Sequence, residues 1–307
     1  MKFLLSAIAF ILLLSAPSSS HATCVINCGK DQQTTKLVFK YNDRFDEHHL
    51  NLSSSVLGKD LGFGHRWETK TRRGLKEWNI QVVQAEAGVA RLGTRMLKFE
   101  TREGFCTKSH GNSGWDDCKN GRSRAEIKSL WKNEVKPNKP FWHSYSFRIP
   151  STIEQKIGVK TSIWQIHSGS ASPSWMIRFT KDSGLKIENH TVFPPAETVL
   201  IPRAHLFDQW HDVVINANLS KDTDGSFKLW VNGEVKFQFN GQTKQLAAKR
   251  DSIDLGVYNT GSRYSDINMN GKNLGNITVF FDELRVGDNC KDLQLAELGY
   301  ACSALRH

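Results

Sequence analysis

The 307-residue chain lacks the short motifs that mark several large enzyme classes. It contains no G-x-S-x-G element, no H-E-x-x-H element and no glycine-rich phosphate-binding loop. These absences argue against a serine hydrolase of the α/β type, an H-E-x-x-H metalloprotease and a P-loop nucleotide hydrolase.

Long apolar runs are also scarce, and the clearest one lies at the amino terminus. Lys2 precedes the apolar run Phe10–Leu14, and Ser20-His-Ala22 places small residues where a signal peptidase reads them. This pattern predicts a signal peptide over residues 1–22, because the run is too short to span a bilayer. No later segment is apolar enough to span one. We expect a secreted protein, extracellular or periplasmic, in which residues 23–36 form an N-terminal arm.

Cysteine is infrequent as well, with six residues in the chain and no C-x-x-C pair among them. The missing pair argues against a zinc site, and an even number of cysteines in an exported chain predicts disulfides. The simplest connectivity joins sequence neighbours, as Cys24–Cys28, Cys106–Cys118 and Cys290–Cys302, and the sequence leaves the other connectivities open.

The formal net charge is +10, which in an exported protein favours a polyanionic partner or a negatively charged surface. The basic residues are dispersed along the chain, and no nucleic-acid-binding motif is present. We therefore expect no nucleic acid partner. We also expect a monomer without a membrane span.

Helical periodicity is scarce, whereas short alternating runs separated by Gly, Asn, Asp, Ser and Pro are frequent. This pattern is typical of an all-β sandwich or barrel. Asn232-Gly233 predicts a tight hairpin turn, and Leu293–Leu298 predicts a short terminal helix. No internal repeat or linker divides residues 37–307, so we expect one domain there. The predicted strands are Met96–Thr101, Ser123–Trp131, Phe141–Ile149, Thr161–Ile166, Ser174–Thr180, Leu185–Asn189, Trp210–Ala217, Gly225–Val231, Glu234–Asn240, Ser252–Asn259 and Ile277–Val286.

Three separate segments alternate so that their polar side chains fall on one side: Arg122–Lys128, Trp164–His167 and Ile253–Tyr258. Successive side chains of a β-strand point to opposite faces of its sheet. If the three strands are neighbours in one sheet, one face carries a set of polar groups that could bind an acidic sugar and move a proton on it. That set is Arg122, Arg124, Glu126, Lys128, Gln165, His167, Asp254 and Tyr258.

These segments resemble those of the jelly-roll polysaccharide lyases, a group that includes heparin lyase I-like, glucuronan and alginate lyases. Arg124-Ala-Glu126-Ile-Lys128 is similar to their R-x-E-x-R strand, and Gln165-Ile-His167 matches their Q-I-H element. Leu255–Asn259 matches part of their K-x-G-x-Y-x-Q strand. The spacing of apolar and aromatic residues in Trp210–Gly241 resembles the second half of concanavalin-type domains. The resemblance implies an all-β, concanavalin-type β-jelly roll, in which two curved antiparallel sheets present a concave glycan-binding face.

The resemblance also implies a reaction. Such lyases remove the C5 proton of a uronate and expel the group on O4, which leaves a 4,5-unsaturated uronate end. By resemblance, Tyr258 would be the acid and also a candidate base. His167 would be a base or a neutraliser of the uronate carboxylate, and Gln165 and Arg124 would hold that carboxylate.

Further substrate-binding residues are predicted around these four: Arg122, Glu126, Lys128, Arg178, Asn259 and Tyr264. Glu126 is expected to orient a neighbouring cation, since a carboxylate facing a polyanion is repelled. The implied partner is an acidic polysaccharide, either alginate, glucuronan or a heparin-like glycan. The resemblance implies no required cofactor, and a structural calcium ion is an option at Asp222, Asp224 and Asp282.

Two other functions fit the same fold. Asp254 and Thr260 stand where the alginate-type strand has Lys and Gln, which leaves room for a non-catalytic, lectin-like module that binds acidic polysaccharide. A glycoside hydrolase needs two carboxylates that flank the bond. The usual E-x-D-x-x-E strand is absent, and Asp282 and Glu283 are adjacent in a predicted strand, where their side chains would face opposite ways.

Overall fold

The computed structural model describes residues 67–69, 76, 78–86, 89–106, 116–129, 139–156, 158–167, 172–248, 251–261 and 274–306. All of these residues belong to one compact unit, Lys36–His307. The predicted signal peptide, the arm at 23–36, the pair Cys24–Cys28 and Tyr264 lie outside the described residues. Within the described part of the chain, no helix has the length and apolar character needed to cross a membrane.

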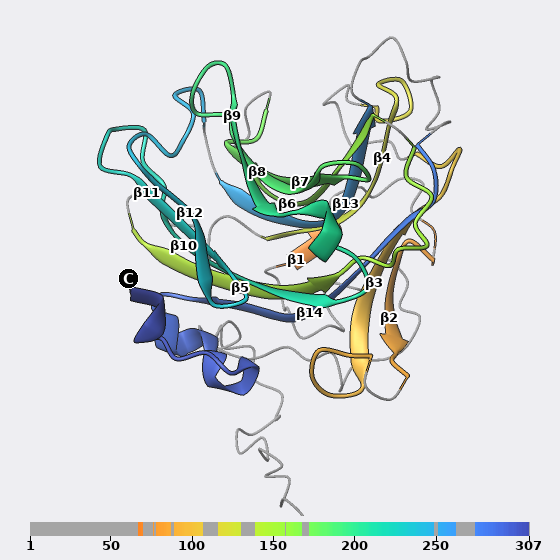
Figure 1. Cartoon of the computed structure of the whole chain (residues 1–307). Coiled ribbons are helices and arrows are strands. Elements are labelled where there is room, and N and C mark those ends of the chain that lie inside the picture. Colours follow the sequence, from red (N-terminus) through yellow and green to blue (C-terminus); the bar gives the residue numbers. More distant parts are fainter. Residues whose placement is uncertain are drawn as a thin grey trace, which may run out of the picture. The chain divides into compact units, whose positions relative to one another are not determined.

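Two antiparallel seven-stranded sheets make up the described part of this unit (Figure 1). We call them the front sheet and the back sheet. The front sheet consists, in spatial order, of β1 (Trp67–Thr69), β4 (Arg122–Ser129), β13 (Ser252–Gly261), β6 (Val159–His167), β7 (Trp175–Thr180), β8 (Gly184–Asn189) and β9 (Ala196–Ile201). The back sheet consists of β12 (Glu234–Asn240), β11 (Ser226–Val231), β10 (Trp210–Asn218), β5 (Phe141–Arg148), β14 (Ile277–Gly287), β3 (Arg95–Thr101) and β2 (Ile80–Gln84). This architecture confirms the predicted β-jelly roll.

The predicted strands are present, with ends within two residues of the predicted ones. The short strands β1, β2 and β9 were not predicted. In β9 the first four residues, Ala196 to Val199, are all exposed, so this edge strand has no alternation of apolar and polar residues. Its pairing with β8 is what makes it a strand, and that long-range contact leaves no local sequence pattern.

The predicted helix at Leu293–Leu298 is wrong in type. The chain instead forms two short 3₁₀ helices, η3 (Cys290–Leu293) and η4 (Leu295–Leu298). Gln294 lies between them in a left-handed conformation, with φ of 49°, which interrupts a continuous helix. Two further 3₁₀ helices are η2 (Arg203–His205) and η5 (Ala304–Arg306).

The main core lies between the two sheets and takes alternate residues from each strand. Trp175 of β7 stacks on Phe227 of β11 with ring centres 4.4 Å apart, and Trp164 of β6 meets the same ring edge-on at 6.2 Å. Burying an aromatic side chain of this size contributes roughly 2–3 kcal/mol. Because the core uses these residues, the residues between them face away from the back sheet. We call that side of the front sheet the concave face, since the front sheet curves around it (Figure 1).

A smaller core covers the outer side of the back sheet at the carboxyl terminus. Leu293, Leu295 and Leu298 of the 3₁₀ helices pack with Val214 and Trp230 of the back sheet. A disulfide joins Cys290 to Cys302 and closes this segment. The second disulfide, Cys106–Cys118, lies just before β4. Both match the predicted neighbour pairing.

Candidate active site

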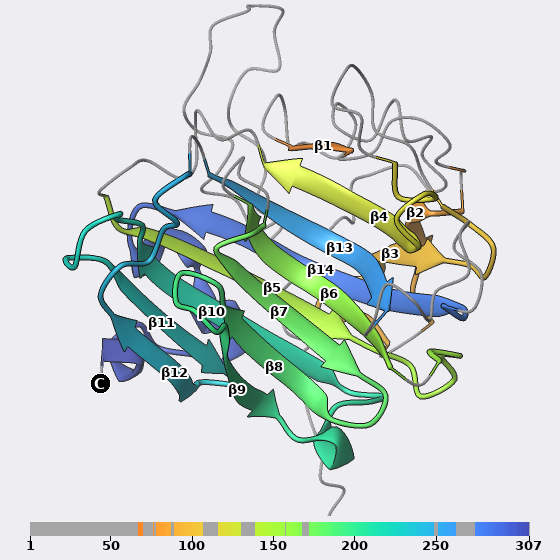
Figure 2. The same ribbon diagram turned by 90° about the horizontal axis from the view of Figure 1, so that it is seen from above.

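The three segments that carry the predicted polar set are neighbours in the front sheet. Strand β13 pairs with β4 on one side and with β6 on the other (Figure 2). Tyr258 lies opposite Arg124 of β4 and Ser162 of β6, and Asp254 lies opposite Gln165 of β6. The structure therefore brings these side chains to one face of one sheet, as the alternation predicts.

The side chains of Gln165 and Glu126 meet although β13 lies between their strands. Gln165 Nε2 donates a hydrogen bond to Glu126 Oε1 at 2.7 Å. Gly256 is the β13 residue opposite Glu126 and places no side chain there. Its φ is +142°, and an added Cβ would lie 2.3 Å from the carbonyl oxygen of Ala125, so only glycine fits. The register of β13 against β6 also shifts here, which marks a β-bulge.

Tyr258 is buried, with 5% of its surface exposed, and two arginines of β4 contact it. Arg122 Nη1 donates a hydrogen bond to the Tyr258 hydroxyl. The Arg124 guanidinium lies over the other part of the side chain, 3.9 Å from the ring centre, where the ring quadrupole attracts a cation. Two positive charges therefore lie beside the Tyr258 side chain, one at its hydroxyl and one over its ring.

Arg124 is itself held by two buried carboxylates. Its Nε and Nη2 donate to the two oxygens of Asp117 at 2.5 and 2.6 Å, and its Nη1 donates to Glu126 at 3.3 Å. Burial alone would lower the pKa of Arg124, but the negative charge of Asp117 raises that pKa well above the usual value. All three guanidinium nitrogens are engaged by the protein, so the geometry favours a fixed Arg124 over one that turns toward a sugar carboxylate.

Sequence reasoning missed Asp117. It lies in the turn before β4 and outside every alternating segment, so no periodicity marks it. The one available signal is its position beside Cys118, whose disulfide to Cys106 holds the turn.

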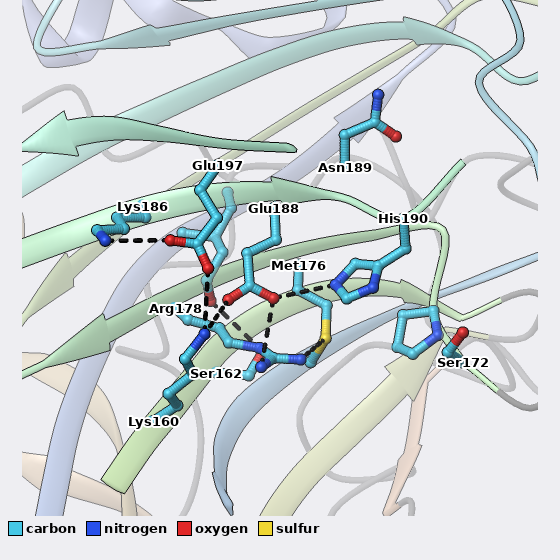
Figure 3. Close-up of polar contacts among 12 residues, drawn as sticks. Lys160, Ser162, Ser172, Met176, Arg178, Lys186, Glu188, Asn189, His190 and Glu197 are labelled. Carbon is cyan, nitrogen blue, oxygen red and sulfur yellow. Dashed lines mark hydrogen bonds and ion pairs between the residues drawn. The ribbon is translucent and has the colours of Figure 1, made fainter. Parts of the chain in front are cut away.

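A second charged cluster lies on β6, β7 and β8 of the same face and centres on Glu188 (Figure 3). This carboxylate accepts hydrogen bonds from Lys160 Nζ at 3.2 Å and His190 Nε2 at 3.0 Å, and it forms an ion pair of 3.3 Å with Arg178 Nη1. Lys160 also donates to Glu197 of β9 at 3.1 Å. Burial alone would raise the pKa of Glu188, but the hydrogen bond from His190 and the charges of Arg178 and Lys160 lower it to about 2. Glu188 is therefore a carboxylate at any ordinary pH.

Arg178 connects the two clusters. It lies opposite Ser162, which in turn lies opposite Tyr258. Burial lowers the pKa of Arg178 below the usual value, Glu188 and Tyr258 oppose that shift, and the positive charge of Arg122 adds to it. The predicted substrate-binding residue Arg178 thus lies within electrostatic reach of the Tyr258 site.

His167 occupies a different point on the concave face. It lies at the end of β6 opposite Ser252, whereas Tyr258 lies opposite Ser162. Five residues of β6 separate the two positions, which corresponds to roughly 16 Å along the strand. The register therefore argues against joint action of His167 and Tyr258 at one sugar atom. It favours contacts of the two side chains with different parts of a bound polysaccharide. Lys128, at the other edge of the set, lies opposite Asp254.

Asn259 does not share the concave face, and its predicted contact with substrate needs correction. Its side chain is fully buried between the sheets, where Nδ2 donates to Thr101 Oγ1 at 2.6 Å. Its Oδ1 accepts a hydrogen bond from Thr161 Oγ1 at 2.9 Å. The alternation along β13 sends Asn259 inward because the preceding residue, Tyr258, points outward.

The residues considered for a metal ion or a hydrolase pair lie elsewhere. Among the residues that the structure describes, no three His, Cys, Asp or Glu side chains are grouped so that they could hold a metal ion. The calcium ligands suggested at Asp222, Asp224 and Asp282 are therefore not brought together. Asp282 and Glu283 are fully buried in β14 of the back sheet, and Glu283 forms an ion pair with Arg285. Neither carboxylate can flank a bond of a polysaccharide on the concave face.

Solved structures that are similar to this chain include polysaccharide-cleaving lyases. An endo-β-1,4-glucuronan lyase from the fungus Trichoderma reesei is 20% identical, with a TM-score of 0.52 over 73% of this chain and 92% of that one. An alginate lyase of polysaccharide lyase family 7 is 13% identical, with a TM-score of 0.48 over 72% and 94%. An alginate lyase from Pseudomonas aeruginosa is 14% identical, with a TM-score of 0.46 over 72% and 97%. No curated protein sequence matches the chain.

The family model described as polysaccharide lyase matches residues 62–285. This range contains the five strands that build the Tyr258 and Glu188 clusters, β4, β13, β6, β7 and β8, and it covers most of the chain. The resemblance inferred from the three alternating segments is thereby confirmed, and the chain belongs to the polysaccharide lyase family.

Proposed function

We propose that this polysaccharide lyase cleaves a uronic-acid-containing polysaccharide by β-elimination on the concave face. In that reaction a base takes the proton from C5 of the uronate. The electron pair of the broken C–H bond forms the C4=C5 double bond, and the bond between C4 and the glycosidic oxygen breaks. The leaving oxygen takes up a proton, which yields a 4,5-unsaturated uronate on one fragment and a free hydroxyl on the other.

The observation that carries this proposal is the setting of Tyr258 between two arginines of β4. Its hydroxyl accepts a hydrogen bond from Arg122, and Arg124 covers its ring. As a phenolate, Tyr258 would take the proton from carbon, and the phenol so formed would give that proton to the leaving oxygen. The adjacent guanidinium of Arg122 would stabilise the negative charge that develops during both transfers.

Neutralisation of the uronate carboxylate is assigned to neighbouring donors on the same face. The C5 proton becomes acidic enough only when that carboxylate is hydrogen-bonded, because the developing charge spreads onto it. Gln165 is held in place by Glu126 and keeps a second amide N–H for the substrate. Arg122 and Arg178 supply positive charge, and His167 and Lys128 would contact sugars farther along the chain. Arg124 is reassigned from carboxylate binding to the support of Tyr258.

The net charge of the chain supports an acidic substrate, and its disulfides support a location outside the cytoplasm. The chain carries a formal net charge of +10, which favours an acidic polymer. Two disulfides in the described residues support action outside the cytoplasm, where such bonds persist. The proposed substrate class comprises alginate, glucuronan and heparin-like glycans.

The test is the ultraviolet absorbance of the unsaturated uronate during incubation with alginate, glucuronan, heparin, heparan and chondroitin. We expect absorbance to rise on one of these substrates and to stay flat in Tyr258→Phe. Tyr145→Phe is the matched control, because Tyr145 is buried in the core and its hydroxyl has no hydrogen-bond partner among the residues that the structure describes. New reducing ends without this absorbance, or full activity of Tyr258→Phe, would overturn the proposal.

A further inference from the structure

Both arginines that touch Tyr258 are anchored to one residue, Asp117. Its carboxylate receives the Nε and Nη2 hydrogen bonds of Arg124, at 2.5 and 2.6 Å. Its main-chain carbonyl receives the N–H of Arg122 at 2.8 Å. Asp117 thus holds the guanidinium that covers the tyrosine ring and the backbone of the arginine that donates to the tyrosine hydroxyl.

The pair formed by Asp117 and Arg124 is rigid and shielded from water. Two parallel N–H···O bonds to one carboxylate fix the guanidinium plane as well as its position. The Asp117 side chain is 1% exposed and that of Arg124 is 8% exposed. Cζ of this guanidinium lies 3.9 Å from the centre of the Tyr258 ring. A change in the Asp117 carboxylate would therefore reach the tyrosine through the Arg124 side chain.

We propose that Asp117 is a positioning residue of this lyase, which acts through Arg124 to hold Tyr258 in its reactive orientation. The proposal rests on the proposed function, since it takes Tyr258 as the proton-transferring group. Asp117 holds Arg124, and Arg124 in turn lies over the ring. Its contribution is to keep Arg124 away from solvent and from the substrate carboxylate, so that Arg124 supports the tyrosine throughout the reaction.

The turn that carries Asp117 is fastened by the Cys106–Cys118 disulfide. Cys118 directly follows Asp117, and its N–H donates to Asp116 Oδ1 at 2.9 Å. The disulfide joins this turn to Cys106, which follows β3 of the back sheet. The covalent bond therefore restrains the turn that carries Asp117. Loss of this disulfide should disturb the Tyr258 site, although neither sulfur reaches it.

The molecule offers a matched control for the carboxylate. Asp212 of the back sheet holds Arg91 by the same two-bond geometry, with Nε and Nη2 donating at 2.9 Å each. It is buried like Asp117, but it faces the carboxyl-terminal segment, where Tyr300 donates to it at 2.6 Å. Asp117→Asn and Asp212→Asn therefore remove equivalent charges, one behind the active site and one remote from it.

The experiment measures kcat and KM on the cleaved polysaccharide for both variants, together with their thermal unfolding. We expect Asp117→Asn to lower kcat by roughly 100-fold, the size of loss that small misplacements cause, with KM close to that of the unchanged enzyme. Asp212→Asn should lower thermal stability and leave kcat unchanged. Adding Asp117→Asn to an Arg124→Met background should lower kcat no further. Unchanged kcat in Asp117→Asn, an effect on KM alone, or a further loss in that background would overturn the proposal.

A pair of disulfide variants decides the question if Asp117→Asn does not fold. Replacing Cys106 and Cys118 with serine should lower kcat, whereas replacing Cys290 and Cys302 should not. Equal kcat in the two variants would overturn the proposal. Tyr258→Phe is assayed beside them: if it stays active, the proposed role of Tyr258 fails, and if it is inactive while Asp117→Asn is fully active, only the positioning role fails.

Discussion

Gln165 donates a 2.7 Å hydrogen bond to Glu126 across the strand that lies between them. That contact joins β6 to β4 on the concave face. The β13 residue opposite Glu126 is Gly256, which has no side chain. A carboxylate that would repel an acidic polysaccharide is thus occupied by Gln165 and Arg124. Glu126 serves the site by orienting these two donors.

Gly256→Ala should destabilise the protein and reduce its activity. The φ of +142° is strained for alanine, and the new Cβ would lie 2.3 Å from the Ala125 carbonyl oxygen. Gly104→Ala is the control, because Gly104 also has positive φ, +78°, but no atom of the described residues lies within 4 Å of an added Cβ. We expect about 1–3 kcal/mol of lost unfolding free energy from strain alone at Gly104, and a larger loss at Gly256. Urea denaturation measures both, and equal losses would contradict the steric argument.

Arg122→Met should lower kcat more than it raises KM. The guanidinium that donates to the Tyr258 hydroxyl would be lost, and removal of one such donor typically costs about 10²–10³ in kcat. Arg102→Met, which breaks an ion pair with Glu100 on the back sheet, should leave both constants unchanged. Steady-state kinetics on the cleaved polysaccharide separates the two effects. A rise in KM without loss of kcat would show that Arg122 only binds substrate.

Glu188→Gln should remove part of the acid sensitivity of the fold. The pKa of Glu188 is about 2 in the folded protein, below its ordinary value of 4.5. As pH falls below about 5, the unfolded chain takes up a proton that the folded protein does not, so the stabilisation is present above that pH and is lost toward pH 2. The shift corresponds to at most about 3 kcal/mol.

The gap in unfolding free energy between the unchanged protein and Glu188→Gln should therefore be largest above pH 5 and should close toward pH 2. Glu234→Gln is the control, since Glu234 pairs with Lys236 in an exposed position, where solvent screens the interaction. Denaturation at a series of pH values measures the gap. A gap that stays constant with pH would contradict the assignment of Glu188 as a stabilising carboxylate.

Asn259→Ala should affect folding and leave substrate binding intact. The substitution removes the hydrogen bonds to the buried hydroxyls of Thr101 and Thr161, which costs roughly 1–3 kcal/mol for each group left unsatisfied. KM should stay unchanged, because the side chain points away from the concave face. An increase in KM with normal stability would restore the original prediction that Asn259 binds substrate.

Replacing Cys290 and Cys302 with serine should lower stability without lowering kcat. The disulfide closes a loop with a sequence separation of 12 residues, and closure of a loop of this length contributes about 3 kcal/mol. The loop packs on the outer side of the back sheet beside Trp230, away from the Tyr258 site. Thermal unfolding and kinetics under the same conditions test both parts, and a loss of kcat in a folded variant would contradict the separation of the two regions.

Much of the concave face could be predicted from sequence because strand alternation is local. The side chains of Arg122, Arg124 and Glu126 point the same way in any extended strand, and so do Gln165 and His167. The same rule would have placed Asn259 inward, opposite to Tyr258, but resemblance to a motif outweighed it. The strands themselves were predictable where apolar residues alternate, and β9 was missed because its first residues are all exposed.

The sequence by itself therefore determined which residues share a face. Its three alternating segments were also enough to indicate the polysaccharide lyase family. Only the tertiary structure decided which of them touch. The pairing of β13 with both β4 and β6 set Tyr258 against Arg124 and moved His167 away from it, and a turn held by a disulfide supplied Asp117. The physical reason is that side-chain direction follows from the pleat of a single strand, whereas register and loop contacts depend on interactions between segments far apart in the chain.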